Sequence, residues 1–339
     1  MKTIISLLLI MLIGYEAYNF FGKTTLFKAP QVSFEYNKNT MSIDALADSL
    51  VAKKIITDKI NFTLFAGIFE IETKTKSGKF LVKKGASLFK ILRMLRNNQQ
   101  PTVKFILNKV RTRGELSKLV ATTFSTDSAD CAIFFNSNDS LAAFSTDTTQ
   151  LLTLFLPNTY EFYWSTSIPT LLKKMKEEQA KFWNQKNRKE KATAIGMTMD
   201  QVYTLASIVE EETNNDSDKT LIASVYQNRL KKNMPLQACP TIKFAMQDFT
   251  LTRIYEKYLN NPSPYNTYRK TGLPPGPICT PAPKTIDLVL DAPNTKYLYF
   301  VAKSDFSGYH HFSSTYEEHN KYANEYQKKL DEYQKKKLK

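Results

Sequence analysis

The chain opens on an apolar run that covers residues 3–21, with an uninterrupted centre from Leu7 to Ile13. This run is near the length that a helix needs to span a bilayer. A cleaved signal peptide has a similar apolar centre, but no pair of small residues follows at the spacing of a cleavage site. The pattern therefore favours an uncleaved transmembrane anchor over residues 1–22, with a signal peptide as the alternative.

Between residues 30 and 124 the spacing of apolar positions changes repeatedly. From Ile43, and again from Leu88, apolar residues recur at the spacing of one helical face, and Ser42 stands where a helix cap is expected. Apolar and polar residues alternate over Val103–Leu107, which predicts a strand. These short helical and strand-like stretches predict a small α+β module over residues 30–124.

The next segment, residues 125–153, is rich in Ser, Thr, Asp and Asn and predicts an irregular connection. Within residues 154–330, apolar residues recur at the spacing of one helical face over longer stretches. This pattern predicts a larger, mixed α+β domain. Four of the last five residues are lysine, so residues 331–339 are expected to form a solvated basic tail. The longer helices are expected over residues 167–188, 199–213, 221–230 and 316–339.

Composition narrows the class of protein. The chain has 339 residues, and with 42% of them hydrophobic it is too apolar for a disordered protein. A mean hydropathy of −0.37 is too polar for a polytopic membrane protein. The net charge of +15 favours an anionic partner such as nucleic acid, a lipid surface or an acidic polymer. A nucleic-acid partner would require a cytoplasmic location, and we do not expect one.

Several familiar cofactor and metal motifs are absent from the sequence. It contains no GxSxG, P-loop or GxGxxG pattern, so it lacks the residues of serine hydrolases, NTPases and dinucleotide enzymes. His310, His311 and His319 do not match a zinc pattern. The three cysteines are too scattered for a disulfide framework. We therefore expect neither a metal nor a cofactor.

Three consecutive glutamates end the apolar helix expected over residues 199–213. Leu205, Ile208 and Glu212 fall on one stripe of that helix. Because a carboxyl group in apolar surroundings resists ionisation, Glu212 is the best candidate for a general acid. If the helix frays at its end, all three glutamates are instead exposed to solvent.

The segment over residues 265–277 combines aromatic, amide and hydroxyl side chains with three prolines. Sugar rings stack on aromatic side chains, and sugar hydroxyls need fixed donors and acceptors. The segment therefore predicts carbohydrate recognition, with a purely structural Pro/Gly loop as the alternative.

A series of motifs extends these observations along the chain. In order they read LPNTYEF from 156, LASIVEEET from 205, IASVYQNRL from 222, MPLQ from 234, YNTYRKTGLPPGPI from 265, YLYFVA from 297 and HHFSSTYEEHN from 310. This series resembles the endolytic murein transglycosylases, the YceG-like or MltG family. The resemblance covers most of residues 155–325, and residues 30–124 are more weakly similar to the LysM-like module of that family.

The resemblance implies an enzyme, a lytic transglycosylase that acts as a carbon–oxygen lyase on peptidoglycan. It would cleave the β-1,4 bond between N-acetylmuramic acid and N-acetylglucosamine within glycan strands and leave 1,6-anhydro ends. The catalytic acid/base of the family corresponds to Glu212, with Glu210 as the fallback. The residues that the same motifs imply for the glycan groove are Asn228, Gln237, Thr241, Tyr265, Asn266, Thr267, Tyr268, His311, Phe312 and Ser313.

The resemblance also implies a place in the cell. The chain would cross the inner membrane once, with its N-terminus inside and its catalytic domain in the periplasm. Its partners would be peptidoglycan glycan strands and the peptidoglycan synthases, beside which it would limit the length of nascent strands. The basic charge would then face anionic lipids and wall polymers.

Two departures from the family pattern introduce cysteine. Cys239 follows Ala238 where the family commonly has Thr-Asp, and Cys279 begins a segment that replaces Ser/Asn-x-Pro-Gly. The missing aspartate affects the expected substrate contacts but not the acid. As a hypothesis, Cys239 and Cys279 lie close together and form a disulfide in an oxidising compartment.

Two other functions stay open. A catalytically silent, membrane-anchored protein could bind peptidoglycan through the LysM-like module. A hydrolytic muramidase could use the same acid but would leave reducing ends in place of anhydro ends.

Overall fold

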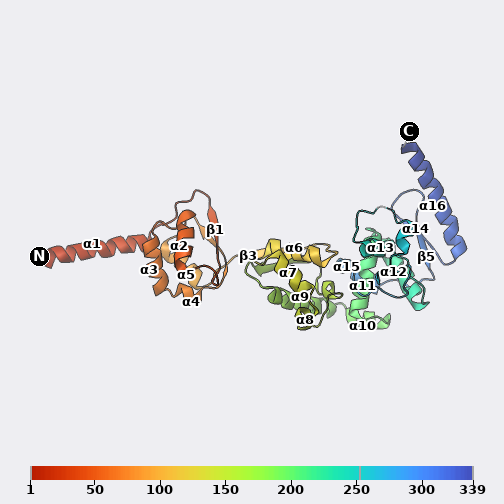
Figure 1. Cartoon of the computed structure of the whole chain (residues 1–339), viewed down its shortest axis with the longest axis horizontal. Helices are drawn as coiled ribbons and strands as arrows, with labels where there is room; N and C mark the ends of the chain where they lie inside the picture. The colour runs from red at the N-terminus through yellow and green to blue at the C-terminus, as the bar shows by residue number, and fades with distance from the viewer. Residues whose placement is uncertain (1, 252, 338–339) are drawn as a thin grey trace. The chain divides into compact units, whose positions relative to one another are not determined.

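The computed structural model describes residues 2–251 and 253–337. They form two compact units, whose elements are labelled in Figure 1. The chain passes from one unit to the other more than once, so the division differs from the predicted boundary at residues 125–153. The first unit holds the chain up to Phe105, Thr123–Ser125 and Glu161–Ser167, and the second holds Ile106–Thr122, Thr126–Tyr160 and the chain from Ile168 on.

The first unit combines a small sheet with short helices. Its elements are α1 (Lys2–Phe21), β1 (Gln31–Tyr36), α2 (Ile43–Ala52), α3 (Lys59–Ile68), α4 (Ile71–Lys74), β2 (Gly78–Lys83) and α5 (Leu88–Arg96). Strands β1 and β2 pair antiparallel with Phe34 opposite Phe80, and both rings are buried. Ser42 caps α2, as the sequence predicts, by accepting a hydrogen bond from the Ala45 amide.

Helix α1 arises from the apolar run at the start of the chain. Near its end, the Phe20 ring packs against Phe65 of α3 and Phe89 of α5, with ring centroids 4.3 and 5.5 Å apart. In the described part of the chain, no helix has the length and apolarity that crossing a membrane requires. The predicted transmembrane anchor over residues 1–22 is therefore not supported.

The second unit is mainly helical. Its helices are α6 (Arg113–Thr123), α7 (Ser128–Phe135), α8 (Asn138–Ala142), η1 (Leu151–Leu154), α9 (Ile168–Trp183), α10 (Arg188–Ala194), α11 (Met199–Glu212), α12 (Asp216–Lys231), α13 (Cys239–Met246), α14 (Glu256–Leu259), α15 (Pro283–Leu290) and α16 (Tyr316–Lys337). Its strand pair is small and joins β5 (Tyr299–Ala302) to β6 (His310–Ser313). A further small pair, β3 (Thr102–Leu107) with β4 (Asn158–Tyr163), has residues in both units. The mixed α+β class is confirmed.

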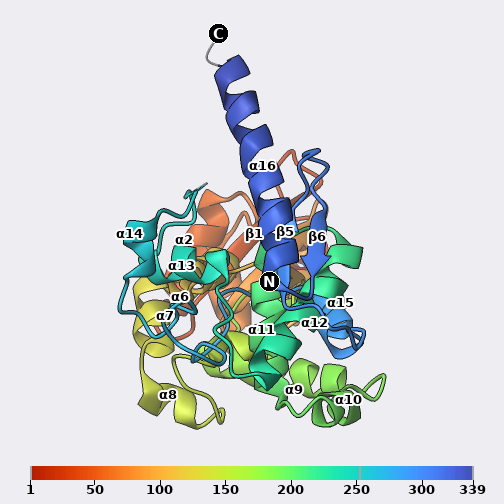
Figure 2. The same cartoon turned by 90° about the vertical axis from the view of Figure 1, so that its right-hand side faces the viewer.

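The apolar core of the second unit lies between α11, α12 and α15, which Figure 2 shows beside one another. Leu205, Ile208 and Val209 of α11 are fully buried there, together with Ile222 of α12 and Ile286 of α15. The helical stripe read from the sequence is therefore the side of α11 that faces the core.

Two segments differ from expectation. Residues 125–153 are not irregular but hold α7, α8 and η1, because Asp127 and Ser137 cap short helices that bury Cys131, Phe135 and Leu141. The helix expected over residues 167–188 ends at Trp183. Lys186 and Asn187 then take left-handed backbone angles, and the chain restarts as α10.

Three consecutive polar side chains of α12 hold loops that follow much later in the chain. The Gln227 amide donates to the Val289 carbonyl at 2.8 Å. Asn228 donates to the carbonyls of Thr295 and Tyr297, both at 2.9 Å. The buried Arg229 guanidinium donates to carbonyls on both sides of α12, those of Leu298, Pro235 and Leu236. Since buried carbonyl groups need partners, these side chains fix the path of the surrounding backbone.

The β5–β6 hairpin is joined to α12 by a buried carboxylate. Asp218 accepts hydrogen bonds from the backbone N–H of His310 at 2.9 Å and lies 2.7 Å from its Nδ1. On the other side, the His311 ring stacks on Tyr322 of α16 with centroids 4.1 Å apart. Beyond these contacts the rest of α16 projects away from the hairpin (Figure 2).

The loop over residues 265–277 contains one position that requires glycine. A Cβ atom on Gly276 would lie 2.1 Å from the carbonyl oxygen of Thr149, closer than any real contact. We expect Gly276→Ala to lower the free energy of unfolding by about 2 kcal/mol or more, because backbone must move. Urea denaturation measures this change.

The matched control for this test is Gly67→Ala in α3, where nothing lies within 4 Å of the added atom. Alanine favours a helix more than glycine does, so the control is expected to stabilise the protein by about 0.5–1 kcal/mol. Equal stability of Gly276→Ala and the unchanged protein would contradict the close approach of the two segments.

Candidate active site

The last turn of α11 carries three consecutive glutamates. Thr198 begins the helix with a capping box, and the residues from Val202 to Val209 are buried. The three carboxylates therefore leave the helix just where it emerges from the apolar core. Because a helix turns about 100° per residue, each carboxylate meets a different set of neighbours.

Glu210 is held by cations. Its Oε2 lies 2.8 Å from Nζ of the buried Lys219 and also accepts a hydrogen bond from the Thr285 hydroxyl. Its Oε1 lies 3.9 Å from Nζ of Lys109. Both oxygens of this residue, the fallback acid, are therefore engaged by other groups of the protein.

Glu211 forms a bidentate ion pair. Arg111 donates from Nε to Oε1 at 3.1 Å and from Nη2 to Oε2 at 3.0 Å, and Lys109 lies 3.3 Å from Oε1. Burial acts to raise the pKa of Glu211, but the hydrogen bonds and charges of Arg111 and Lys109 outweigh it and lower that pKa. Glu211 therefore stays ionised near neutral pH.

None of the residues that the structure describes forms an ion pair with Glu212. In the part of the chain that the structure describes, its only hydrogen-bond partner is the Tyr226 hydroxyl, which donates to Oε1 at 2.5 Å. Burial raises the pKa of Glu212 to about 7, although the Tyr226 hydrogen bond and the charge of Lys243 act against this rise. The carboxyl can therefore hold a proton near neutral pH and release it to a substrate.

Two more polar groups lie beside Glu212. The Cys239 Sγ and the Tyr268 hydroxyl are 3.1 Å apart, and the charge of Glu212 acts on both. Burial, together with that charge, raises the pKa of the thiol and of the phenol above their usual values. Both groups therefore stay protonated and can donate hydrogen bonds beside the acid.

Most of the other predicted groove residues between 228 and 267 bind the protein's own backbone. Asn266 donates to the carbonyls of Leu259 and Asn261 at 2.8 and 2.7 Å. The Thr267 hydroxyl accepts from the Ala238 amide and lies 2.9 Å from the Thr241 hydroxyl. Like Asn228, these side chains are occupied in shaping the loops around the site.

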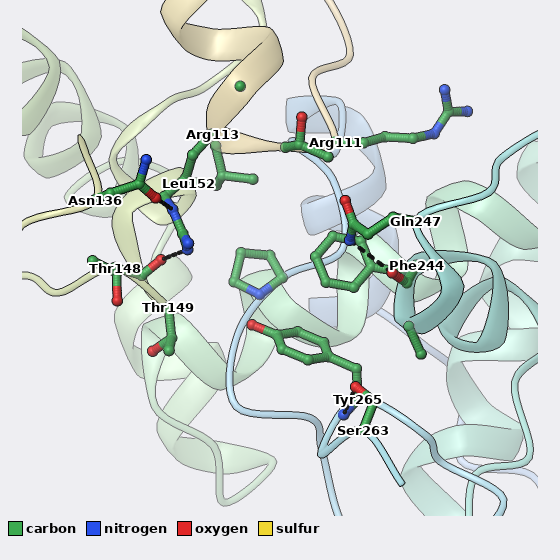
Figure 3. A pocket seen from close by; sticks show the side chains of 14 residues that line it. Arg111, Arg113, Asn136, Thr148, Thr149, Leu152, Phe244, Gln247, Ser263 and Tyr265 are labelled. Atoms are coloured by element: carbon green, nitrogen blue, oxygen red, sulfur yellow. Dashed lines mark hydrogen bonds between the residues drawn. The ribbon is translucent and has the colours of Figure 1, made fainter. Parts of the chain in front are cut away.

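Gln237 and Tyr265 are more accessible. Gln237 is exposed, has a left-handed backbone with φ of 53°, and accepts a hydrogen bond from Arg229 at 3.2 Å. Tyr265 is half-buried, and its ring centroid lies 4.6 Å from that of Phe244. Together, Tyr265 and Phe244 form one side of a cavity (Figure 3).

The predicted groove residues of β6 belong to a cluster of rings. Phe312 packs with Phe300, whose ring meets Tyr226 edge-on at 5.8 Å. His311 is stacked on α16, and Ser313 is fully buried. In the described ranges no group of three or more His, Cys, Asp or Glu side chains is arranged to hold a metal ion.

The hypothesis of a disulfide is wrong. All three cysteines are free thiols. Cys279 is fully buried, with its Sγ 3.4 Å from the Ser207 carbonyl, whereas Cys239 is exposed beside Tyr268. The two thiols therefore belong to different environments, one in the core and one at the candidate site.

Sequence reasoning missed the residues that set the states of the glutamates. Tyr226, Arg111 and Lys243 reach the end of α11 from three other segments. Tyr226 lies within the motif that begins at residue 222, but its contact with Glu212 depends on how α11 and α12 pack. Arg111 is 100 residues from its partner Glu211. Nothing in the sequence around Arg111 indicates that the two residues form an ion pair.

A comparison with protein families accounts for most of the chain. Residues 37–325 match the model of the YceG-like family. The chain belongs to the YceG-like family. Among solved structures, this YceG-like chain is similar to a yceG-like protein from Listeria monocytogenes, with a TM-score of 0.55 and 25% sequence identity. That likeness covers 86% of this chain and 98% of the Listeria chain.

Curated relatives of the YceG-like chain carry one name. A protein of Bacillus subtilis (strain 168) called endolytic murein transglycosylase is 39% identical over 166 residues, which are 49% of this chain and 45% of the relative. A protein of the same name from Streptococcus pneumoniae serotype 2 (strain D39) is 32% identical over 169 residues, 49% of this chain and 30% of the relative. The chain thus spans less than half the length of these relatives.

The raised pKa of Glu212 predicts a pH-dependent cost in stability. Between an ordinary pKa of 4.5 and the folded value of about 7, the folded state holds a proton that the unfolded state releases. Stability is therefore lost as the pH rises through this window. Glu212→Gln removes this titration, so we expect the free energy of unfolding of the variant to match that of the parent near pH 4.5 and to exceed it by about 3 kcal/mol at pH 8. Urea denaturation across this pH range measures both free energies of unfolding. A difference between variant and parent that does not change with pH would show that Glu212 is solvated and would contradict the prediction.

The hydrogen bond from Tyr226 predicts a second shift. A donor that binds the carboxylate favours its charged form, so its removal in Tyr226→Phe should raise the pKa of Glu212 further, by roughly 0.5–1 pH unit. A carbon-13 NMR titration of the glutamate carboxyl measures this directly. The control is Tyr203→Phe, because the Tyr203 hydroxyl donates to the Phe155 carbonyl instead. An unchanged or lower pKa in Tyr226→Phe would contradict the assignment.

Proposed function

We propose that the YceG-like chain is an endolytic murein transglycosylase. It cleaves the β-1,4 bond between N-acetylmuramic acid and N-acetylglucosamine inside peptidoglycan strands and leaves 1,6-anhydro ends. Membership of the family supports this proposal, as do the names of the Bacillus and Streptococcus relatives. The supporting observation within the molecule is the isolated, protonatable carboxyl group of Glu212.

In the first half of the proposed reaction, Glu212 acts as an acid. Its proton passes to the glycosidic oxygen while the bond from that oxygen to C1 of the muramic acid breaks. A general acid works best when its pKa lies near the working pH, and the pKa of Glu212 is raised to about 7. Tyr226 stabilises the carboxylate that remains after the proton has left.

In the second half, the carboxylate of Glu212 acts as a base. It takes the proton of the C6 hydroxyl as that oxygen forms a bond to C1 of the same sugar. The 1,6-anhydro ring is thereby closed and the strand is cut without a water molecule, so the same carboxyl group ends in its protonated form. One residue can therefore serve both halves of the reaction.

The state of the neighbouring glutamates favours this reaction over hydrolysis. Glycoside hydrolysis usually needs two free carboxyl groups, one as an acid and one as a base or nucleophile. Glu210 and Glu211 are engaged by Lys219 and Arg111, which leaves Glu212 alone among the three. A site with one available carboxyl suits a reaction in which the substrate supplies its own nucleophile.

The same proposal includes a place in the cell. The resemblance to the family is the reason to place the chain at the inner membrane, with its catalytic part in the periplasm. There it would limit the length of nascent strands beside the peptidoglycan synthases. Separation of the membranes of expressing cells, followed by detection of the chain, tests the location.

Analysis of the reaction products tests the activity. We expect purified protein incubated with peptidoglycan strands to release fragments of mixed length with anhydromuramic ends, as measured by mass spectrometry. Glu212→Gln should lower the rate by at least about 100-fold, because the acid is lost. The control Glu190→Gln replaces an exposed glutamate of α10 and should cleave normally.

Each alternative function has its own result in this assay. Reducing ends in place of anhydro ends would identify a hydrolytic muramidase. Binding to strands without any fragments would identify a silent wall-binding protein. Full activity of Glu212→Gln would remove Glu212 from the mechanism.

A further inference from the structure

A cavity of about 370 Å³ opens on the second unit near the candidate site. Figure 3 shows Arg113, Asn136 and Thr148 on one side of it and Phe244 and Tyr265 on the other. Of the described residues that line it, two are arginines and none is an aspartate or glutamate. The cavity therefore presents positive charge, hydroxyl groups and aromatic faces.

Arg113 brings a positive charge to the cavity, and the charge of Asp147 acts on the same wall, at Tyr265. It donates from Nε to the Asn136 amide oxygen at 2.8 Å and from Nη1 to the Thr148 carbonyl at 2.6 Å. Both partners are neutral, and no carboxylate of the described residues forms an ion pair with this guanidinium. The nearby Asp147 is occupied by the Thr149 and Gln150 amides. Arg113 is thus held in one orientation with donors left over for a ligand.

The opposite wall is apolar and aromatic, and its two rings are tilted by 44° to each other. The rings of Tyr265 and Phe244 lie 4.6 Å apart, and Pro277 continues the surface they form. Gly276, next to Pro277, is pressed against the Thr149 carbonyl, so the two walls are fixed relative to each other. Such a wall suits the aliphatic and amide groups of a peptide.

The cavity shares two elements with the surroundings of Glu212. Arg111 lines it and also forms the ion pair with Glu211. Helix α13 contributes Phe244 to the cavity, while its preceding residue Lys243 acts electrostatically on Glu212. These shared elements connect the cavity to the last turn of α11.

We propose that the cavity binds the peptide stem of the substrate, with Arg113 pairing with a carboxylate of that stem. The assignment rests on the proposed function, in which the substrate is peptidoglycan. Within such a strand, the sugar rings are largely neutral and the stems carry the carboxylates. An arginine without a protein carboxylate therefore selects the stem rather than the sugar, and cleavage should be faster where muramic acid bears a peptide.

Direct binding of a soluble stem tests the cavity without any catalytic step. The probe is the tetrapeptide that an amidase releases from peptidoglycan, titrated calorimetrically into the full chain. We expect Arg113→Gln to weaken its binding by about 10-fold or more, because a charge-assisted pair is lost. Gln247→Glu places a negative charge at the exposed edge of the cavity without removing Arg113, and should also weaken binding. The control Lys118→Gln removes an exposed charge from the same helix, α6, and should bind normally.

Cleavage of two substrates gives the second readout. On strands that keep their stems, Arg113→Gln should raise KM about 10-fold while kcat stays near that of the parent. On strands stripped of stems by the amidase, with the lactyl carboxylates that this hydrolysis frees blocked as amides, the variant and the parent should be equal. Equal losses on both substrates, or unweakened binding of the tetrapeptide by both cavity variants, would overturn the proposal. If the parent cleaves neither substrate, the proposed function fails, and the tetrapeptide titration still decides whether the cavity binds stems.

Discussion

Three carboxylates follow one another at the point where α11 leaves an apolar core, and that place cannot hold three free negative charges. Ionised groups lose hydration as they approach the core, so each needs either a cation or a proton. The protein supplies cations to Glu210 and Glu211 and leaves Glu212 with a phenol. The difference between a structural carboxylate and a chemically useful one is therefore made by the neighbours and not by the residue type.

Those neighbours come from widely separated parts of the chain. Lys109 and Arg111 precede α11 by about 100 residues, Lys219 begins the next helix, and Thr285 belongs to α15. The packing of α11, α12 and α15 into one core is what brings them together. Polar side chains of α12 then form hydrogen bonds to backbone carbonyls of the surrounding loops. The apolar core and the charge pattern are thus two results of the same arrangement.

The sequence was sufficient for the parts of this arrangement that depend on local spacing. The stripe of Leu205, Ile208 and Glu212 predicted which glutamate would be shielded, and the helix ends at Ser42 and near residue 212 followed from local signals. The pairing of Arg111 with Glu211 could not be predicted, because nothing local links residues so far apart. The helices of 125–153 were missed since their polar composition, which resembles a loop, serves to cap very short helices.

The contacts of Gln227, Asn228 and Arg229 also bear on the order in which the chain is made. Their carbonyl partners from Val289 to Leu298 lie more than 60 residues further along. When α12 first appears during synthesis, these partners do not yet exist, and neither does Thr285, which helps to hold Glu210. Domains generally fold as units once their residues are available. The first unit needs nothing beyond Ser167, whereas the surroundings of Glu212 can assemble only when the chain has been synthesised as far as Leu298, so they are incomplete in a partly made chain.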